Sequence, residues 1–245
     1  MQDVIIASEL GPNPAPISEL IWALRVQRGL CVRRLHLLTN RYGERYLHEL
    51  VFALDMLKQV FDDAPELAPL IYAVDDVGQR VETDLSAAAS AAWMRARWKN
   101  LRRALDDAGP DPVVFAIASN RERSVLTTGM YTLLARPGDL CLDVRVSEPR
   151  VKGARANFFF PDQPAICADE DGVIDPRSVE VTLVELRLPQ LRGLLQEDAL
   201  ASYDAALAAT QSAVTGARRP RITINLAQLS VTISGAPVSM TDSQV

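Results

Sequence analysis

The sequence is poor in the residues that most metal centres and nucleophilic sites require. Its 245 residues include two histidines and three cysteines, and the cysteines, Cys31, Cys141 and Cys167, stand far apart. This spacing offers neither a disulfide framework nor a Cys-X-X-Cys metal site. Two histidines give little support to a metal-ligand cluster or a catalytic triad. We therefore expect no metal and no cofactor.

The sequence also lacks long apolar runs. No run approaches the roughly 18 residues that a membrane-spanning helix needs, and the chain enters an apolar strand without a basic leader segment. Hydrophobic residues make up 48% of the chain and charged residues 23%, as in ordinary globular proteins. We expect a soluble cytoplasmic protein of one large domain, or one domain with an appendage, and no membrane partner.

Lysine is almost missing from an otherwise ordinary set of charges. The net charge is −5, and of the 26 basic residues only Lys58, Lys99 and Lys152 are lysines, which leaves 23 arginines. Guanidinium groups bind phosphate oxygens in a fixed geometry, so this bias suits phosphate recognition. The base composition of the genome is the simpler explanation.

Short apolar segments alternate with amphipathic segments over the first 146 residues. We expect strands at 3–8, 32–39, 70–74, 113–118 and 140–146, and helices at 16–28, 42–61, 85–107 and 124–134. Strands that alternate with helices and are apolar throughout predict an α/β fold with a Rossmann-like, doubly wound, mostly parallel sheet.

Beyond Glu148 this alternation is lost. A strand is expected at 179–188 and a helix at 197–213, and apolar residues alternate again over 221–233. We therefore predict a Rossmann-like ligand-binding domain over residues 1–150 and a small C-terminal α+β extension over residues 151–245.

Two loops are the candidates for a ligand site, because ligands bind doubly wound sheets at the carboxyl ends of the strands. Residues 11–16 follow the first strand and residues 119–124 follow the fourth, and each loop ends at a helix N-terminus, whose free amides favour an anion. Gly-X-Gly-X-X-Gly and Walker A motifs are absent, which argues against ordinary NAD and ATP sites. The alternatives are that the first loop only turns the chain and that Arg121 and Arg123 are solvated surface residues.

Other conspicuous residues have structural explanations. His36 alternates with leucines on a strand and is expected to be structural, and Cys31 and Cys141 are expected to fill apolar space. The aromatic residues 158–160 could stack on bases, but core or interface packing is the favoured interpretation.

Several short motifs follow one another between residues 3 and 195. They read Gly-Pro-Asn-Pro at 11–14, Ser-Glu at 18–19, Leu-Leu-Thr at 37–39, Asp-Asp-Val-Gly at 75–78, Ala-Ser-Asn-Arg-Glu at 118–122, Arg-Pro-Gly-Asp at 136–139, Ser-Glu-Pro at 147–149, Asn-Phe-Phe-Phe-Pro at 157–161 and Leu-Arg-Leu-Pro-Gln-Leu-Arg at 186–192. In this order they resemble the motifs of the CRISPR-associated CARF proteins, in particular the CRISPR-associated ring nucleases.

The resemblance implies a homodimer that binds cyclic oligoadenylate, the second messenger of type III CRISPR defence, with cyclic tetra-adenylate as the expected ring. It also implies metal-independent cleavage, in which a ribose 2′-hydroxyl attacks the neighbouring phosphate and leaves a 2′,3′-cyclic phosphate. The implied catalytic residues are Asn13, Arg121 and Arg123. The implied ligand-binding residues are Gly11, Asn13, Ser18, Ser119, Asn120, Arg121 and Arg123.

The chain departs from the family pattern at the positions that matter most. Asn13 replaces the family Ser, Glu122 replaces the Lys, and Ser119 and Asn120 replace two glycines. A carboxylate that faces phosphate is repelled, so cleavage is expected to be weak unless Arg121 or Arg123 takes the place of the Lys.

Two alternatives to a ring nuclease therefore stay open. One is a non-catalytic CARF sensor or regulatory module, for this or another adenylated ligand, that controls a C-terminal or partner effector. The other is an unrelated Rossmann-like protein whose loops bind no nucleotide. No DNA binding is expected from this chain.

Overall fold

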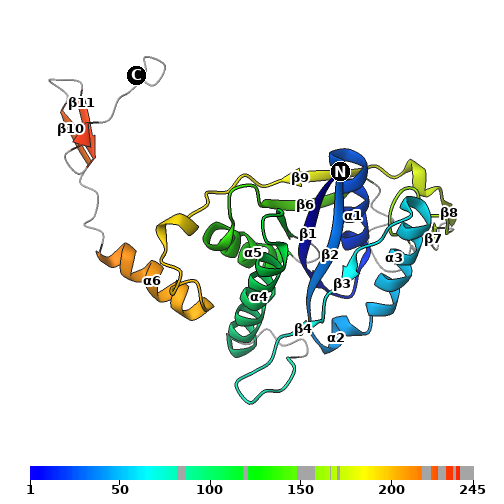
Figure 1. Cartoon of the computed structure of the whole chain (residues 1–245), viewed down its shortest axis with the longest axis horizontal. Coiled ribbons are helices and arrows are strands. Elements are labelled where there is room, and N and C mark those ends of the chain that lie inside the picture. The colour runs from blue at the N-terminus through cyan, green and yellow to red at the C-terminus, as the bar shows by residue number, and fades with distance from the viewer. Residues whose placement is uncertain are drawn as a thin grey trace.

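The computed structural model describes residues 1–81, 87–117, 121–147, 158–165, 167–169, 172–216, 222–225, 230–233 and 236–237. A seven-stranded sheet lies at the centre (Figure 1), in the order β3-β2-β1-β5-β6-β9 with β4 also paired to β2. Its strands are β1 (Gln2–Leu10), β2 (Leu30–Thr39), β3 (Glu66–Leu67), β4 (Ile71–Tyr72), β5 (Val113–Ala116), β6 (Leu140–Val146) and β9 (Val181–Glu185).

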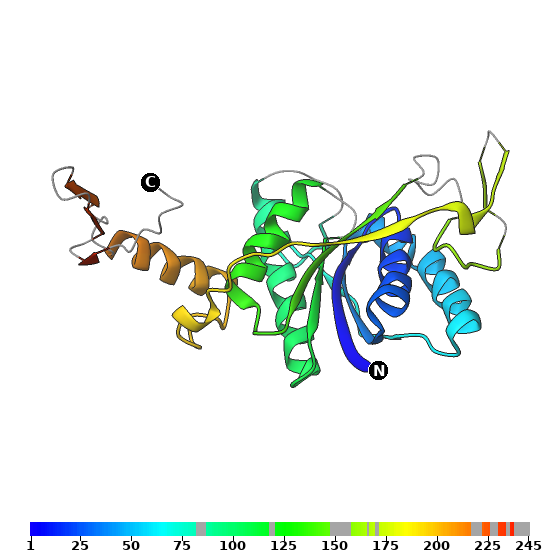
Figure 2. The same cartoon turned by 90° about the horizontal axis from the view of Figure 1, so that it is seen from above.

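Neighbouring strands of this sheet are parallel, except that β9 runs antiparallel to β6. Four longer helices cover both of its faces, with α1 and α3 on one side and α4 and α5 on the other (Figure 2). The helices are α1 (Ala15–Arg28), α3 (Leu47–Phe61), α4 (Ala87–Ala108) and α5 (Arg121–Leu134). The predicted α/β fold with a mostly parallel sheet is confirmed.

The two cores follow from the alternation of side chains along the strands. In β1, Ile6 packs with Leu24 and Leu57 under α1 and α3, whereas its neighbour Ile5 packs with Leu101 and Leu134 under α4 and α5. Successive side chains of a strand point to opposite faces, so a strand that is covered on both faces must be apolar throughout. None of the described helices is long and apolar enough to cross a lipid bilayer.

The helix predicted at 42–61 is in fact two helices. A short helix α2 (Arg41–Glu44) is capped by Asn40, whose Oδ1 accepts from the Gly43 amide at 2.7 Å, and α3 begins at Leu47. Gly43 lies against the end of β1, and this contact fixes the direction of α2. Apolar periodicity does not detect such a contact, because it depends on a neighbour far away in the sequence.

The boundary predicted at residue 150 does not match the way the sheet is built. β9 lies beyond it and yet forms the last strand of the central sheet through its pairing with β6. Phe158, Phe159 and Phe160 are buried in the cores on the α1 side, which agrees with the packing role expected for them.

The rest of the C-terminal part consists of small elements. They are the hairpin β7 (Cys167–Asp169) and β8 (Gly172–Ile174), the 3-10 helices η2 (Pro176–Ser178) and η3 (Arg192–Leu194), the helix α6 (Tyr203–Gly216), and a three-stranded sheet of β10 (Ile222–Asn225), β11 (Ser230–Ile233) and β12 (Ala236–Pro237). Before α6, Leu200 joins the core under α4, where its carbonyl accepts from Trp98 Nε1 at 3.3 Å.

His36 makes the stability of the sheet depend on pH. It is buried in β2, and its Nε2 lies 3.0 Å from Asp107 Oδ2 without the alignment of a hydrogen bond. Burial lowers the pKa of His36, a shift that Asp107 opposes and that Arg34 and Arg103 reinforce. The unfolded chain therefore takes up this proton at a higher pH than the native protein does.

We expect the free energy of unfolding to fall as the pH drops below the ordinary histidine pKa of about 6.5, with a slope from this group of at most about 1.4 kcal/mol per pH unit. His36→Gln should remove this component between pH 7.5 and 5, whereas His48→Gln, at an exposed position, should keep it. Urea unfolding at several pH values measures the difference. An unchanged pH dependence in His36→Gln would contradict the assignment.

Candidate functional site

The central strands β1 and β5 part at their carboxyl ends. Their pairing runs from Ile5 opposite Val113 to Ala7 opposite Phe115 and stops there, whereas β1 continues to Leu10 against β2. The helices that follow β1 and β5 cover opposite faces of the sheet. Between these two strands therefore lies the topological switch point, where doubly wound sheets bind ligands. The two loops singled out in the sequence both start here.

The first loop ends in a turn that Asn13 stabilises. Asn13 Oδ1 accepts from the Ala15 amide at 3.2 Å, at the start of α1, and Gly11 before it is half-buried. Pro14 and Pro16 have no amide hydrogen, so the start of α1 offers few donors to an anion. Since Oδ1 is engaged, the Nδ2 group of Asn13 is the part of the side chain that can bind an acceptor.

Ser18 lies inside the protein. Its side chain has no exposed surface, and its hydroxyl lies 2.9 Å from both the Ala15 and the Phe159 carbonyl oxygens. It thereby joins α1 to the segment that contains Phe159. Contact between Ser18 and a ligand stays a prediction.

The second loop is shorter than the sequence predicted. Ser119 and Asn120 lie outside the described residues, and α5 begins at Arg121, three residues before the expected start at Ser124. Arg121 and Arg123 therefore belong to the first turn of a helix that starts at the switch point. The first amides of a helix have no partner within it and attract anions. Glu122 is in the same turn, and the helix dipole stabilises a negative charge at this end of a helix.

A buried polar network under the switch point is not predicted from the sequence. Arg97 of α4 has no exposed surface, and its Nη2 donates to the carbonyl oxygens of Ala7 and Ala116, each at 3.3 Å. Its Nη1 donates to Asn100 Oδ1 at 2.8 Å. The guanidinium thus lies where β1 and β5 separate and donates to one carbonyl of each strand.

Glu9 of β1 supplies the opposite charge. Its Oε1 lies 3.7 Å from Arg97 Nε and accepts from Trp93 Nε1 at 3.3 Å. Burial lowers the pKa of Arg97, and the nearby Glu9 opposes that shift. A buried charge needs a counter-charge and hydrogen-bond partners, and the network provides both. The signal in the sequence that could have indicated this network is an acidic residue at the end of an apolar strand, in a chain that also has an arginine-rich helix.

The end of β1 is also held from the side of β2. Thr39 Oγ1 donates to the Leu10 carbonyl at 2.9 Å, directly before Gly11. A methyl group at Gly43 would overlap that same carbonyl oxygen and lie 2.6 Å from Thr39 Oγ1. Thr39 and Gly43 together therefore fix the position from which the first loop begins.

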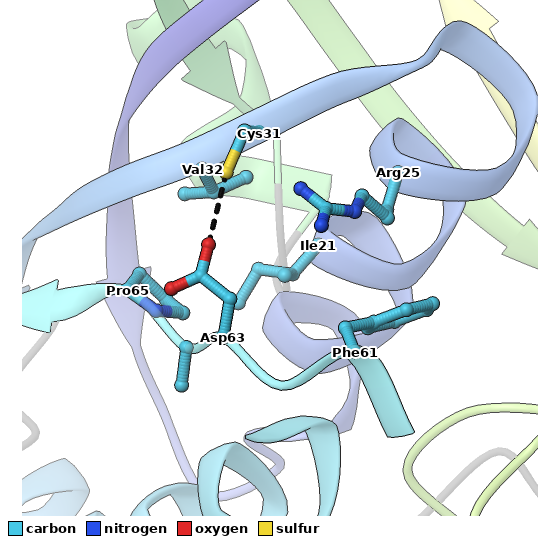
Figure 3. Close-up of a pocket in the computed structure, with 8 residues that line it drawn as sticks. Ile21, Arg25, Cys31, Val32, Phe61, Asp63 and Pro65 are labelled. Carbon is cyan, nitrogen blue, oxygen red and sulfur yellow. Dashed lines mark hydrogen bonds between the residues drawn. The ribbon is translucent and has the colours of Figure 1, made fainter. Parts of the chain in front are cut away.

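Cys31 and Cys141 are poorly suited to act as nucleophiles. Cys141 is buried in β6, and burial raises the pKa of its thiol to about 12. Cys31 lines a small cavity of about 20 Å³ with Arg25 and Phe61, and its thiol donates to Asp63 Oδ2 at 3.1 Å (Figure 3). Burial and Asp63 raise the pKa of Cys31 as well. A thiol with a raised pKa is a poor nucleophile near neutral pH.

The donors of the described part of the chain do not form a metal centre. No group of three or more His, Cys, Asp or Glu side chains among the described residues is placed to hold an ion. Helix amides, the Asn13 amide and the guanidinium groups of α5 belong to the segments that follow β1 and β5, and such donors suit a phosphate group.

Comparisons with known proteins do not assign this chain to a family. No protein-family model matches it, and no curated protein is significantly similar to it. Its function must be inferred from the fold and from the residues at the switch point.

Proposed function

We propose that the chain binds a cyclic oligoadenylate at the switch point, with cyclic tetra-adenylate as the preferred ring. The observation that supports the proposal is the separation of β1 and β5 after Ala7 and Phe115, because the loop at Gly11 and the helix α5 follow these two strands at the carboxyl edge of the sheet. The motifs of the two loops supply the identity of the ligand, through their resemblance to CARF proteins.

The two sides of the proposed site make unequal contributions. Prolines and the bond from the Ala15 amide to Asn13 leave the start of α1 few free amide donors. The start of α5 carries two arginines within three residues, besides its free amides. We infer that α5 holds the phosphates through Arg121 and Arg123, while Gly11 and Asn13 line the opposite wall.

The proposed assembly is a homodimer, because a symmetric ring presents the same groups to two identical loops. The two copies of Arg121 and Arg123 would then surround one ring. Cleavage would use a ribose 2′-hydroxyl held in line with the neighbouring phosphate, with an arginine stabilising the charge that develops on the phosphate oxygens. Glu122 opposes this charge, so binding without cleavage, as in a sensor, is the alternative within the same proposal.

The test is to incubate the purified protein with cyclic tri-, tetra- and hexa-adenylate in the absence of metal. Thermal unfolding measures binding, and chromatography follows products. We expect stabilisation by one ring. Arg121→Ala should weaken binding about tenfold, the size of one charged hydrogen bond. Arg177→Ala, an exposed arginine of η2, should leave it unchanged.

Glu122→Lys separates the two alternatives. If the carboxylate suppresses cleavage, the variant should form a 2′,3′-cyclic phosphate product faster than the native protein does, because a cation then replaces a charge that repels phosphate. Stabilisation by a ring without cleavage in either protein would identify a sensor. No response to any of the three rings would overturn the proposal.

A further inference from the structure

An open groove of about 490 Å³ is lined by residues of α4, of β4 and of the segment that follows β4. The helix side consists of Ala92, Arg95, Ala96, Lys99 and Arg103, which recur every three or four residues and so form one stripe along α4. The volume lies within the range of about 300–1,000 Å³ that is usual for small-molecule sites.

The opposite side of the groove is held in place. Tyr72 donates its hydroxyl to Glu44 Oε1 at 2.7 Å, and the guanidinium of Arg80 lies 3.6 Å from the centroid of its ring. Glu44 in turn pairs with Arg80 at 2.8 Å. The aromatic wall is therefore already ordered before any ligand enters.

The acidic groups of the groove are already engaged. Asp76 pairs with Arg95 at 2.7 Å. Asp75 Oδ1 accepts from the amides of Val77 and Gln79 at 3.0 and 2.8 Å. The ion pair neutralises Asp76, whereas the amide bonds hold the Asp75 side chain in place and leave its negative charge in the groove.

Two basic residues of the groove, Lys99 and Arg103, differ from Arg95, which is paired with Asp76. Neither has a hydrogen bond or an ion pair with another side chain among the residues that the structure describes, although both line the groove. They are one helical turn apart, so one phosphate group can reach both. Because Arg95 is paired with Asp76, the groove keeps these two exposed cations against the one carboxylate of Asp75, in a chain whose net charge is −5.

We propose that this groove binds the phosphate group of a small organic ligand of nucleotide size. Lys99 and Arg103 hold the phosphate, and the organic part lies against Leu70, Ile71 and the two alanines of the stripe. The groove lies at the β4 edge of the sheet, and β2 separates β4 from β1 and the switch point. It is therefore a second site, distinct from the proposed cyclic oligoadenylate site.

Calorimetric titration of the full chain with ADP, pyrophosphate and adenosine tests the proposal. ADP and pyrophosphate should bind, more weakly at high salt, and adenosine should not. Lys99→Ala and Arg103→Ala should each weaken ADP binding about tenfold. Lys58→Ala, an exposed lysine of α3 outside the groove, is the matched control and should bind as the native protein does.

Arg121→Ala distinguishes the two sites. ADP binding that is unchanged in Arg121→Ala and about tenfold weaker in Lys99→Ala places the ligand in the groove, whatever the cyclic oligoadenylates do. ADP binding that is lost in Arg121→Ala and kept in Lys99→Ala and Arg103→Ala would overturn the groove assignment. So would the absence of any binding of ADP and pyrophosphate at millimolar concentrations.

Discussion

Arg97→Met should lower the free energy of unfolding by about 3–5 kcal/mol, as expected when one partner of a buried ion pair is removed. The Arg97 side chain has no exposed surface and bonds to Ala7, Asn100 and Ala116. Methionine fills similar space but supplies no donor to the two carbonyls and no positive charge beside Glu9. Equilibrium unfolding in urea, followed by circular dichroism, measures the loss.

A second arginine on the same helix serves as the control. Arg102 is partly exposed and lies 3.9 Å from Glu197, so Arg102→Met should cost less than about 1 kcal/mol. The double variant Glu9→Gln/Arg97→Met should recover part of the loss, because the buried negative charge is removed together with its partner. A similar, small loss in Arg97→Met and Arg102→Met would contradict the role assigned to the network.

Gly43→Ala should destabilise the protein by about 3 kcal/mol, near the upper end of the usual cost of overpacking. The added methyl group would overlap the Leu10 carbonyl oxygen, which belongs to the backbone and cannot rotate away. Relief requires α2 or the end of β1 to move, and the loop at Gly11 would move with it. Thermal unfolding measures the stability, and ring binding by the same variant measures the displacement of the loop.

Gly129→Ala is the matched control. Gly129 lies within α5, and a methyl group there meets nothing within 4 Å. Alanine in the interior of a helix is favoured over glycine, so this variant should gain about 0.5–1 kcal/mol. If Gly43→Ala were as stable as Gly129→Ala, the close approach of α2 to β1 would not be a constraint.

Much of the fold follows from local patterns in the sequence. The alternation of apolar strands and amphipathic helices predicted β1, β2, β5 and β6 and the helices between them, because buried strands must be apolar on both faces. The predicted start of α5 at Ser124 was wrong by three residues. The polar residues at 121–123 suit a first helical turn as well as a loop, and a pattern of apolar residues cannot tell the two apart.

The candidate site was predicted only in part. The predicted doubly wound fold indicated the loops after β1 and β5 as candidates, since both follow strands and precede helices at the carboxyl edge of the sheet. The supports of that edge were missed. Arg97 and Gly43 act through contacts with residues tens of positions away, and nothing in their local sequence distinguishes them from an exposed arginine or a loop glycine.

By itself the sequence determined the class of fold, the two loops and the residues within them, because these depend on composition, periodicity and order along the chain. The tertiary structure decided that β9 belongs to the central sheet, that Ser18 is buried, and that Glu9 and Arg97 meet beneath the switch point. Such facts depend on which distant segments come together. That outcome is set by packing over the whole molecule rather than by local preference.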